Sequence, residues 1–226
     1  MAADSAPDWI GACRRSADAI RSMLADKPTI AERVKETGTR GEGGDKTLEI
    51  DQIAEDVVFA ELQKLYDDGA RFTAVSEERG VVSFGDGDRL VVIDPIDGSV
   101  NAKRGLPHFA LSVAVSEGPT MADVVFGFVQ DFGPDEEWVA ARGQGARLDG
   151  VDLDCSLGER RTGDGKLEVL GIESADPRWV VQSADALSET AHRLRAIGAI
   201  AVSLCQVAAG RSTASAGGTT VATSPV

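Results

Sequence analysis

Histidine, cysteine and positive charge are scarce in this 226-residue chain, and each scarcity excludes a class of function. There are two histidines, His108 and His192, and three widely spaced cysteines without a C-x-x-C pair, which argues against a zinc site. The odd cysteine count favours reduced thiols. The net charge of −14, from 37 acidic and 23 basic residues, argues against nucleic acid or an anionic membrane as a partner.

Long apolar runs are missing as well. No stretch approaches the ~20 apolar residues that cross a bilayer. The first residues are acidic and do not resemble a signal peptide. We therefore expect a cytoplasmic protein. A hydrophobic content of 42% with 25 glycines suits a compact α/β or α+β chain, built as one domain or as two tightly joined lobes.

The clearest chemical signal follows the apolar run 90–93, which we predict to be a short buried strand. Asp94 and Asp97 stand three residues apart at its end, with the peptide carbonyl of Ile96 between them. Gly98 then allows the backbone to turn with its N–H groups exposed. Hard oxygen ligands beside such amides suit a divalent cation and a phosphate together. A metal-dependent phosphatase is therefore the leading hypothesis.

Two simpler interpretations compete with it. An Asp-rich glycine turn is by itself more often an ordinary loop. A calcium loop of the EF-hand type does not fit, because the glycine stands at the fifth place from Asp94 and the twelfth place is Gly105. The context distinguishes this motif from a plain loop: a strand, a turn, the hydroxyl of Ser99, and a separate acidic pair at Glu77 and Glu78.

Hydrophobic periodicity predicts alternating helices and strands along the chain. The glycine-rich run 37–45 predicts a mobile loop without regular structure. The predicted helices cover 7–24, 47–66, most of 178–194, and 197–209; the predicted strands cover 72–76, 90–93, 109–116, 121–130, 137–141 and 167–172.

The motif D-P-I-D-G-S-x-N at 94–101, with S-E-E at 76–78, resembles the inositol monophosphatase family of magnesium-dependent, lithium-sensitive phosphatases. The segment 41–56, G-x-G-G-D-K-T-x-x-I-D-x-x-A-E-D, resembles the branch that hydrolyses both inositol monophosphates and fructose 1,6-bisphosphate. The resemblance runs from about residue 39 to residue 210. It implies an α/β (α+β) fold, a layered αβαβα sandwich of the sugar-phosphatase type whose second lobe is incomplete. It also implies that the loop at 37–45 closes over the site.

The resemblance implies a site with two or three Mg²⁺ ions. Glu77, Asp94 and the carbonyl of Ile96 are the expected ligands of the first ion. Asp94 would bridge to the second ion, which Asp97 also binds.

The resemblance also assigns catalytic and substrate-binding residues. Asp51 and Ser99 would form the carboxylate–hydroxyl pair that orients and deprotonates the attacking water. The amides of Gly98 and Ser99 would bind phosphate oxygens. Arg195 and Gly198 match a segment that lines the substrate pocket in the family.

The chain departs from the family after Arg211. Family members often read Gly-Arg-Val-Asp-Gly here, and one lost nucleotide converts codons for Val-Asp-Gly into codons for Ser-Thr-Ala, the residues at 212–214. The tail that follows has low complexity and no carboxylate, so we expect it to be disordered or out of frame. The second metal site would then lack its C-terminal aspartate, and turnover would be weak or absent. A naturally short, divergent C-terminus is the alternative.

These observations predict an N-terminal α+β lobe at 1–155 that carries the site, a partial C-terminal lobe at 156–210, and the tail at 211–226. The predicted function is Mg²⁺-dependent hydrolysis of small polyol or sugar phosphate esters, such as myo-inositol monophosphate or fructose 1,6-bisphosphate. Two alternatives are a non-catalytic metal-binding relative and a nucleotide phosphatase of the 3′-phosphoadenosine type. The resemblance also implies a homodimer.

Overall fold

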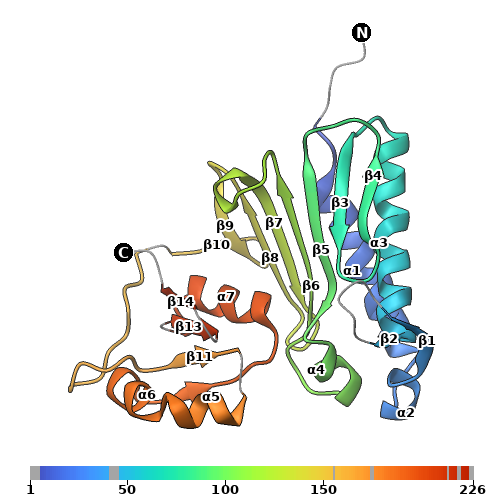
Figure 1. Ribbon diagram of the computed structural model, residues 1–226. Coiled ribbons are helices and arrows are strands. Elements are labelled where there is room, and N and C mark those ends of the chain that lie inside the picture. The colour runs from blue at the N-terminus through green and yellow to red at the C-terminus, as the bar shows by residue number, and fades with distance from the viewer. Residues whose placement is uncertain are drawn as a thin grey trace.

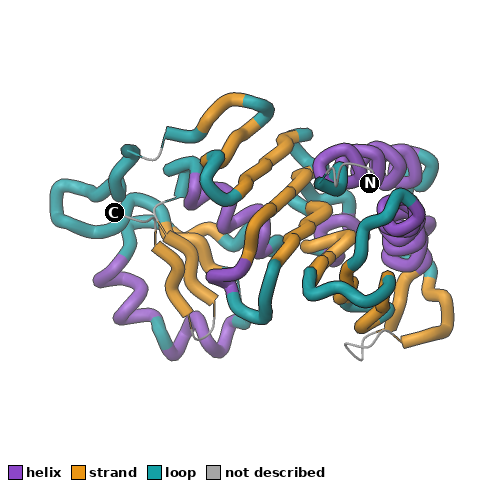
Figure 2. Tube along the Cα trace, turned by 90° about the horizontal axis from the view of Figure 1, so that it is seen from above, coloured by secondary structure: helices purple, strands orange, loops and turns teal. Residues whose placement is uncertain are grey.

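Layers of helix and sheet alternate in the structure, a computed structural model that describes residues 6–40, 46–154, 156–173, 176–212, 214–217 and 220–223. Two long helices, α1 (Trp9–Ala25) and α3 (Glu49–Asp67), cover one face of a large sheet (Figure 1). Helix α7 (Ile200–Ala208) lies between that sheet and a smaller one, and α5 (Pro177–Gln182) and α6 (Ala184–Thr190) cover the smaller sheet. Seen from above, helices flank both groups of strands (Figure 2). The predicted αβαβα sandwich is confirmed.

The large sheet has eight strands in the order β10-β9-β8-β7-β6-β5-β3-β4. Strands β3 and β5 run parallel, whereas the other neighbours pair antiparallel. Its strands are β3 (Phe72–Ser76), β4 (Gly80–Phe84), β5 (Leu90–Asp97), β6 (Ala110–Ser116), β7 (Val124–Asp131), β8 (Glu136–Ala141), β9 (Gly145–Leu148) and β10 (Val151–Asp152). A short 3₁₀ helix, η1 (Met121–Asp123), precedes β7.

Alternation along β6 gives the large sheet two buried faces. Leu111, Val113 and Val115 belong to the core formed with α1 and α3. Ala110 points to the opposite face and packs with Val202 of α7. Successive side chains of a strand point to opposite sides, so one strand serves both layers. Burial of a side chain the size of Leu111 stabilises the fold by about 1.5–3 kcal/mol.

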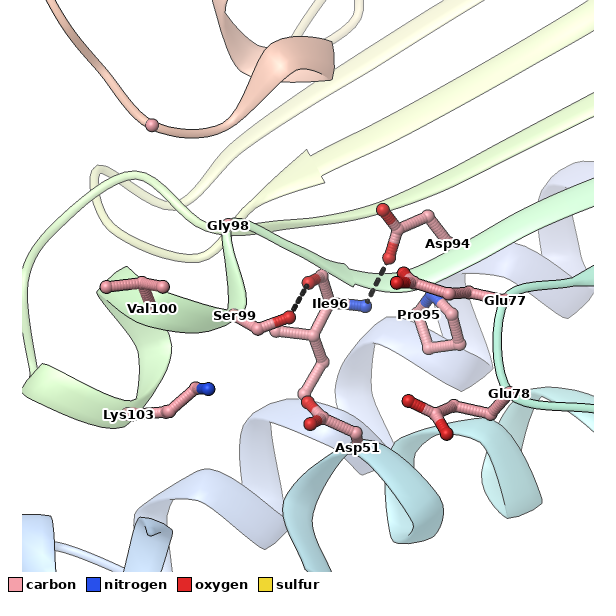
Figure 3. A pocket seen from close by; sticks show the side chains of 11 residues that line it. Asp51, Glu77, Glu78, Asp94, Pro95, Ile96, Gly98, Ser99, Val100 and Lys103 are labelled. Carbon is pink, nitrogen blue, oxygen red and sulfur yellow. Dashed lines mark hydrogen bonds between the residues drawn. The ribbon is translucent and has the colours of Figure 1, made fainter. Parts of the chain in front are cut away.

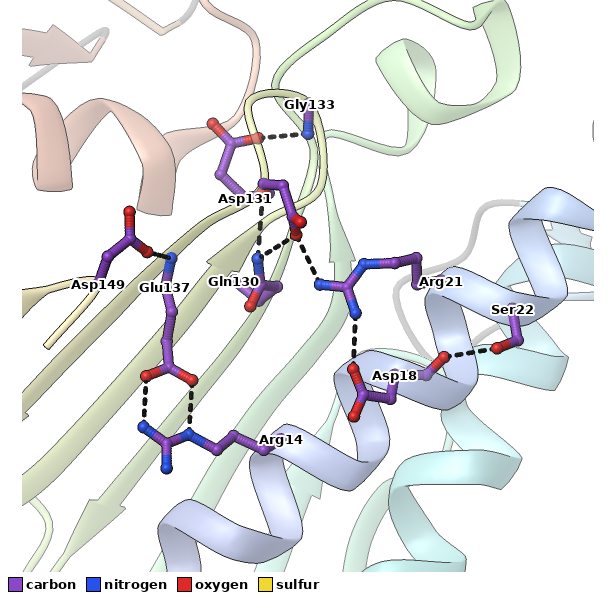
Figure 4. A network of polar contacts seen from close by, with 10 residues as sticks. Arg14, Asp18, Arg21, Ser22, Gln130, Asp131, Gly133, Glu137 and Asp149 are labelled. Atoms are coloured by element: carbon purple, nitrogen blue, oxygen red, sulfur yellow. Dashed lines mark hydrogen bonds and ion pairs between the residues drawn. The ribbon is translucent and has the colours of Figure 1, made fainter.

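Ion pairs reinforce the packing of α1 on the sheet (Figure 4). The Arg14 guanidinium donates two 2.7 Å hydrogen bonds to the carboxylate of Glu137 on β8. Arg21 donates to Asp18 on its own helix and to Asp135 in the β7–β8 turn, each at 2.6 Å. A bidentate arginine–carboxylate pair fixes orientation as well as distance. Helix α1 is therefore held in register along the sheet.

The smaller sheet has four strands in the order β12-β11-β13-β14, with bounds β11 (Leu170–Ile172), β12 (Leu194–Arg195), β13 (Ala214–Gly217) and β14 (Thr220–Thr223). The backbone of β13 runs parallel to β11 and pairs antiparallel with β14. The sequence predicts no regular structure beyond Arg211, so these two strands differ from the prediction. The threonines and valine of β14 are typical of strands, whereas the alanines and glycine of β13 are not, so the local composition does not predict β13. Its strand state depends on pairing with β11, which is distant in sequence.

The segment 37–45, which its glycines predict to be an irregular loop, begins inside one short strand and is followed by another. Strand β1 (Glu36–Arg40) pairs antiparallel with β2 (Lys46–Leu48), while 41–45 lie outside the described residues. The prediction of an irregular segment was therefore wrong for its first four residues, because backbone pairing was not visible in the composition. The remaining short helices are α2 (Ile30–Arg33) and α4 (Ser99–Arg104). In the described part of the chain no helix is long and apolar enough to cross a membrane. The division into lobes at 155 stays a prediction.

Candidate active site

Two parallel strands bring the predicted acidic residues together. Val75 of β3 pairs with Val92 of β5, and Ser76 with Ile93. The next residues along the two strands are Glu77 and Asp94, which therefore lie at the same level of one sheet edge. The carboxyl ends of parallel strands meet at one edge, which is where open α/β sheets bind ligands.

Helix α3 supplies the other wall. Asp51 lies in its first turn, where a carboxylate is favoured by the helix dipole. Together these elements enclose a pocket of about 290 Å³. Its walls are formed by Asp51, Glu77, Glu78, Asp94, Pro95, Ile96, Gly98, Ser99, Val100, Lys103 and Gly198. Figure 3 shows the four carboxylates gathered in this pocket between β5 and α3.

Asp94 is a strongly perturbed carboxylate of the pocket. Burial raises its pKa from 3.8 to about 7, and the negative charges of Asp97, Glu77 and Asp51 add to the rise. A hydrogen bond from the Ile96 N–H to Asp94 Oδ1, at 3.1 Å, acts in the opposite direction. Without a counter-charge, Asp94 therefore keeps its proton well above the pH at which a free aspartate loses it, and both forms are populated near neutral pH.

The hydroxyl of Ser99 has a different partner from the one predicted. It donates to the carbonyl oxygen of Ile96 at 3.0 Å. A hydroxyl has one proton to donate, so in this arrangement that proton is not given to Asp51. Both Asp51 and Ser99 line the pocket, and their predicted pairing requires the hydroxyl to rotate away from Ile96.

Gly98 makes the turn that connects these groups. Its φ of +85° lies in the left-handed region, and a Cβ here would stand 3.0 Å from the Ala199 Cβ and 3.1 Å from the His108 carbonyl oxygen. Backbone conformation and close packing therefore both require glycine at this position.

Asp97 contacts α7, the helix between the two sheets, and does not line the pocket. It is 7% exposed, and its two oxygens accept hydrogen bonds from the N–H groups of Ile200 at 3.1 Å and Ala201 at 2.8 Å. These are N-terminal amides of α7, so Asp97 caps that helix from another layer of the fold. Burial raises the Asp97 pKa, and the α7 amides lower it. The role predicted for Asp97, a ligand of the second ion, stays a prediction.

Asn101 of the same motif also holds the segment before α7. Its amide donates to the carbonyls of His108, at 2.8 Å, and Ile197, at 2.7 Å. The motif at 94–101 therefore forms one wall of the pocket and also binds the segment before α7 through hydrogen bonds. Gly198 lines the pocket as a result.

The remaining predicted residue, Arg195, lies elsewhere. It lines a neighbouring cavity with His108 and Ser203, outside the acidic pocket. From the sequence, Lys103 is taken as a surface charge and given no role, but it lines the acidic pocket and follows Ser99 by four residues on α4. Recognition of 99–104 as a helix would have placed the two on one face.

The donor set suits a hard divalent cation. Carboxylates and a peptide carbonyl are oxygen ligands of the kind that Mg²⁺ binds. A cation would also favour the ionised form of Asp94, whose pKa is raised by burial and by the neighbouring carboxylates. Among the described residues, no three acidic, histidine or cysteine side chains stand close enough to share one ion. Ligand chemistry and charge therefore fit the metal.

The layers and the acidic pocket at the end of β3 and β5 define a protein of the sugar-phosphatase type of αβαβα fold. The chain belongs to the inositol monophosphatase family, which it matches over residues 9–220.

Relatives and solved structures agree with this family. A fructose-1,6-bisphosphatase/inositol-1-monophosphatase of Archaeoglobus fulgidus is 35% identical over 152 residues, which are 67% of this chain and 56% of that protein. Nus factor SuhB of Pasteurella multocida is 30% identical, over 89% of this chain and 72% of its own. A crystal structure of an inositol monophosphatase–fructose 1,6-bisphosphatase superimposes with a TM-score of 0.75 at 25% identity, over 92% of this chain and 75% of that one. The chain thus spans little more than half of the first of these relatives.

Proposed function

We propose that this protein is a Mg²⁺-dependent phosphomonoester hydrolase that acts on small polyol or sugar phosphates. The observation that carries the proposal is the acidic pocket, in which burial and neighbouring carboxylates raise the pKa of Asp94 to about 7. A divalent cation would neutralise the repulsion between these carboxylates and favour their ionised forms. The relatives named as fructose-1,6-bisphosphatase/inositol-1-monophosphatase support myo-inositol monophosphate and fructose 1,6-bisphosphate as the substrates.

The proposed roles of the pocket residues follow from their chemistry, and the oxygen ligands come first. Glu77, Asp94 and the Ile96 carbonyl would hold one ion, and Asp97 would serve a second. When bound, Mg²⁺ lowers the pKa of a coordinated water and neutralises phosphoryl and leaving-group oxygens.

The other groups of the pocket would act on water and phosphate directly. Asp51 would accept a proton from the attacking water. The Ser99 hydroxyl would orient that water after giving up its hydrogen bond to the Ile96 carbonyl. The amides of Gly98 and Ser99 would contact phosphate oxygens. Lys103, on the same wall, adds a positive charge that favours an anionic ester.

A second candidate function is that of a non-catalytic metal-binding member of the family. It is favoured by Asp97, because both of its oxygens accept hydrogen bonds from α7 and a second metal ion would compete with those bonds. Such a protein would bind one cation in the pocket and release no phosphate.

The test is phosphate release from myo-inositol 1-phosphate, fructose 1,6-bisphosphate and 3′-phosphoadenosine 5′-phosphate, with Mg²⁺ and with EDTA. We expect slow release from the first two that requires Mg²⁺, disappears in Asp94→Asn, and persists in Asp86→Asn, a matched change in an exposed turn. Phosphate release that continues at the same rate in EDTA, or in Asp94→Asn, would contradict the proposal. Metal binding without release would favour the second candidate. Weak turnover stays a prediction, which rapid release would overturn.

A further inference from the structure

Glu55 is a buried carboxylate that the proposed mechanism does not use. It lies on α3, is 2% exposed, and contacts both sides of the turn that carries Glu77 and Glu78. Its Oε1 accepts hydrogen bonds from the Ser76 hydroxyl and from the backbone N–H of Arg79, the latter at 3.1 Å. Its Oε2 lies 3.2 Å from Arg79 Nε.

The positions of these two donors along the chain are informative. Ser76 is the last residue of β3 and pairs with Gly80, the first residue of β4. Between the donors Ser76 and Arg79 stand only Glu77 and Glu78. One oxygen of Glu55 therefore holds both ends of the two-residue segment that faces the pocket. Turns are otherwise the freest part of a hairpin, so this carboxylate restricts where the two glutamates can lie.

Glu55 also connects the turn to the opposite wall of the pocket. Asp51 precedes it by four residues on α3, which places the two side chains on one face of the helix, one turn apart. A helix of 19 residues packed on a sheet moves as a rigid unit. The bonds of Glu55 therefore set the separation between Asp51 and the Glu77–Glu78 turn.

Arg79 is secured independently of Glu55. Its guanidinium pairs with Asp56, one position along α3, and lies 4.4 Å above the ring of Phe59. These contacts attach the hairpin to α3 even when Glu55 is changed. Loss of Glu55 should therefore loosen the turn without detaching β4.

We propose that Glu55 is a positioning residue, which holds the Glu77–Glu78 turn against α3 so that its carboxylates and Asp51 face the same cation. The inference rests on the proposed function, since it concerns the proposed metal site. Glu55 does not itself line the pocket, so it acts through the residues that do. The competing interpretation is a purely structural carboxylate that stabilises the hairpin.

The chain provides a matched control for this distinction. Glu61 is also buried on α3, at 8% exposed, and pairs with Arg15 at 2.8 Å and Lys64 at 2.6 Å. It does not line the acidic pocket. Glu55→Ala and Glu61→Ala therefore both remove a bonded, buried carboxylate from one helix, and only the first touches the Glu77–Glu78 turn.

The experiment measures Mn²⁺ affinity by electron paramagnetic resonance under conditions in which each variant is folded. We expect Glu55→Ala to weaken Mn²⁺ binding about tenfold, the size typical of outer-shell changes at metal sites. Glu55→Gln keeps an acceptor for both donors and should recover part of that loss. Glu61→Ala should bind Mn²⁺ like the wild type.

Equal Mn²⁺ affinity in wild type, Glu55→Ala and Glu61→Ala would overturn the inference and leave the proposed function standing. A wild-type chain that binds no Mn²⁺ would overturn both. The two failures are therefore distinguishable.

Two further measurements apply if Glu55→Ala does not fold. Ser76→Ala removes only the hydroxyl donor and should still weaken Mn²⁺ binding, whereas Ser116→Ala, another buried strand serine, should not. Hydrogen exchange at 77–79 should accelerate in Ser76→Ala and stay unchanged in Ser116→Ala. Unchanged exchange and affinity in Ser76→Ala would overturn the inference.

Discussion

Replacement of Asp94 by asparagine should stabilise the metal-free protein. The reason is the environment of this carboxylate, in which burial has the largest effect on its pKa, followed by the charges of Asp97 and Glu77. Asparagine has nearly the same shape, retains an acceptor for the Ile96 N–H, and carries no charge. It therefore keeps the turn and removes the unfavourable charge.

The magnitude follows from the pKa. A rise from 3.8 to about 7 means that folded Asp94 holds its proton more tightly than unfolded Asp94. The wild-type chain therefore loses stability as the pH rises from about 4 to about 7, and the loss is constant above that. At about 1.4 kcal/mol per pKa unit, the full loss is about 4 kcal/mol. Asp94→Asn has no group that ionises here, so its free energy of unfolding does not fall in this way.

The assay is urea unfolding in EDTA at pH 5 and pH 8. At pH 8 the asparagine variant should be more stable than wild type by about 2–4 kcal/mol, and at pH 5 by less than half as much. Asp86→Asn, in an exposed turn, should show no such difference. Equal or lower stability of Asp94→Asn at pH 8 would refute the reasoning, because the pocket would then tolerate the charge.

Two other predictions concern the packing of buried groups. Gly98→Ala forces a Cβ to 3.0 Å from that of Ala199 at a φ of +85°, so urea unfolding should show a loss of about 1–3 kcal/mol. Gly143→Ala, at a φ of +76° but with open space around it, should lose only about 1 kcal/mol, and equal losses would contradict the packing account. Cys13 and Cys205 have pKa values raised to about 12 by burial, so iodoacetamide should label them slowly at pH 8 until urea is added. Rapid labelling of either thiol in the folded protein, followed by mass spectrometry, would show that reasoning to be wrong.

The sequence predicted the long elements of the fold well. Helices α1 and α3 and strand β3 have clear apolar periodicity, so the residues of each element are enough to predict its type. The two-residue strand β12 begins at the last residue of the segment 178–194, which was predicted to be mostly helical. The sequence did not predict this strand, because its state depends on parallel pairing with β11. The pairing of β13 and β14 is likewise set by partners distant in sequence.

The site was predictable in part, for the same physical reason. Asp94 and Glu77 follow apolar strand patterns, and adjacent strand ends converge. The orientation of Asp97 towards α7 depends on a helix more than 100 residues away, which no local pattern contains. Glu55 resembled any polar residue in a long helix, and only the packed hairpin reveals what it holds.

The central claim is that the acidic pocket binds the cation that the proposed chemistry needs. An anomalous difference map from a crystal soaked in Mn²⁺ tests it most directly. The account predicts a peak within coordination distance of Asp94, Glu77 and the Ile96 carbonyl, and no such peak in Asp94→Asn. A map without a peak in that pocket, or with the same peak in the variant, would contradict it.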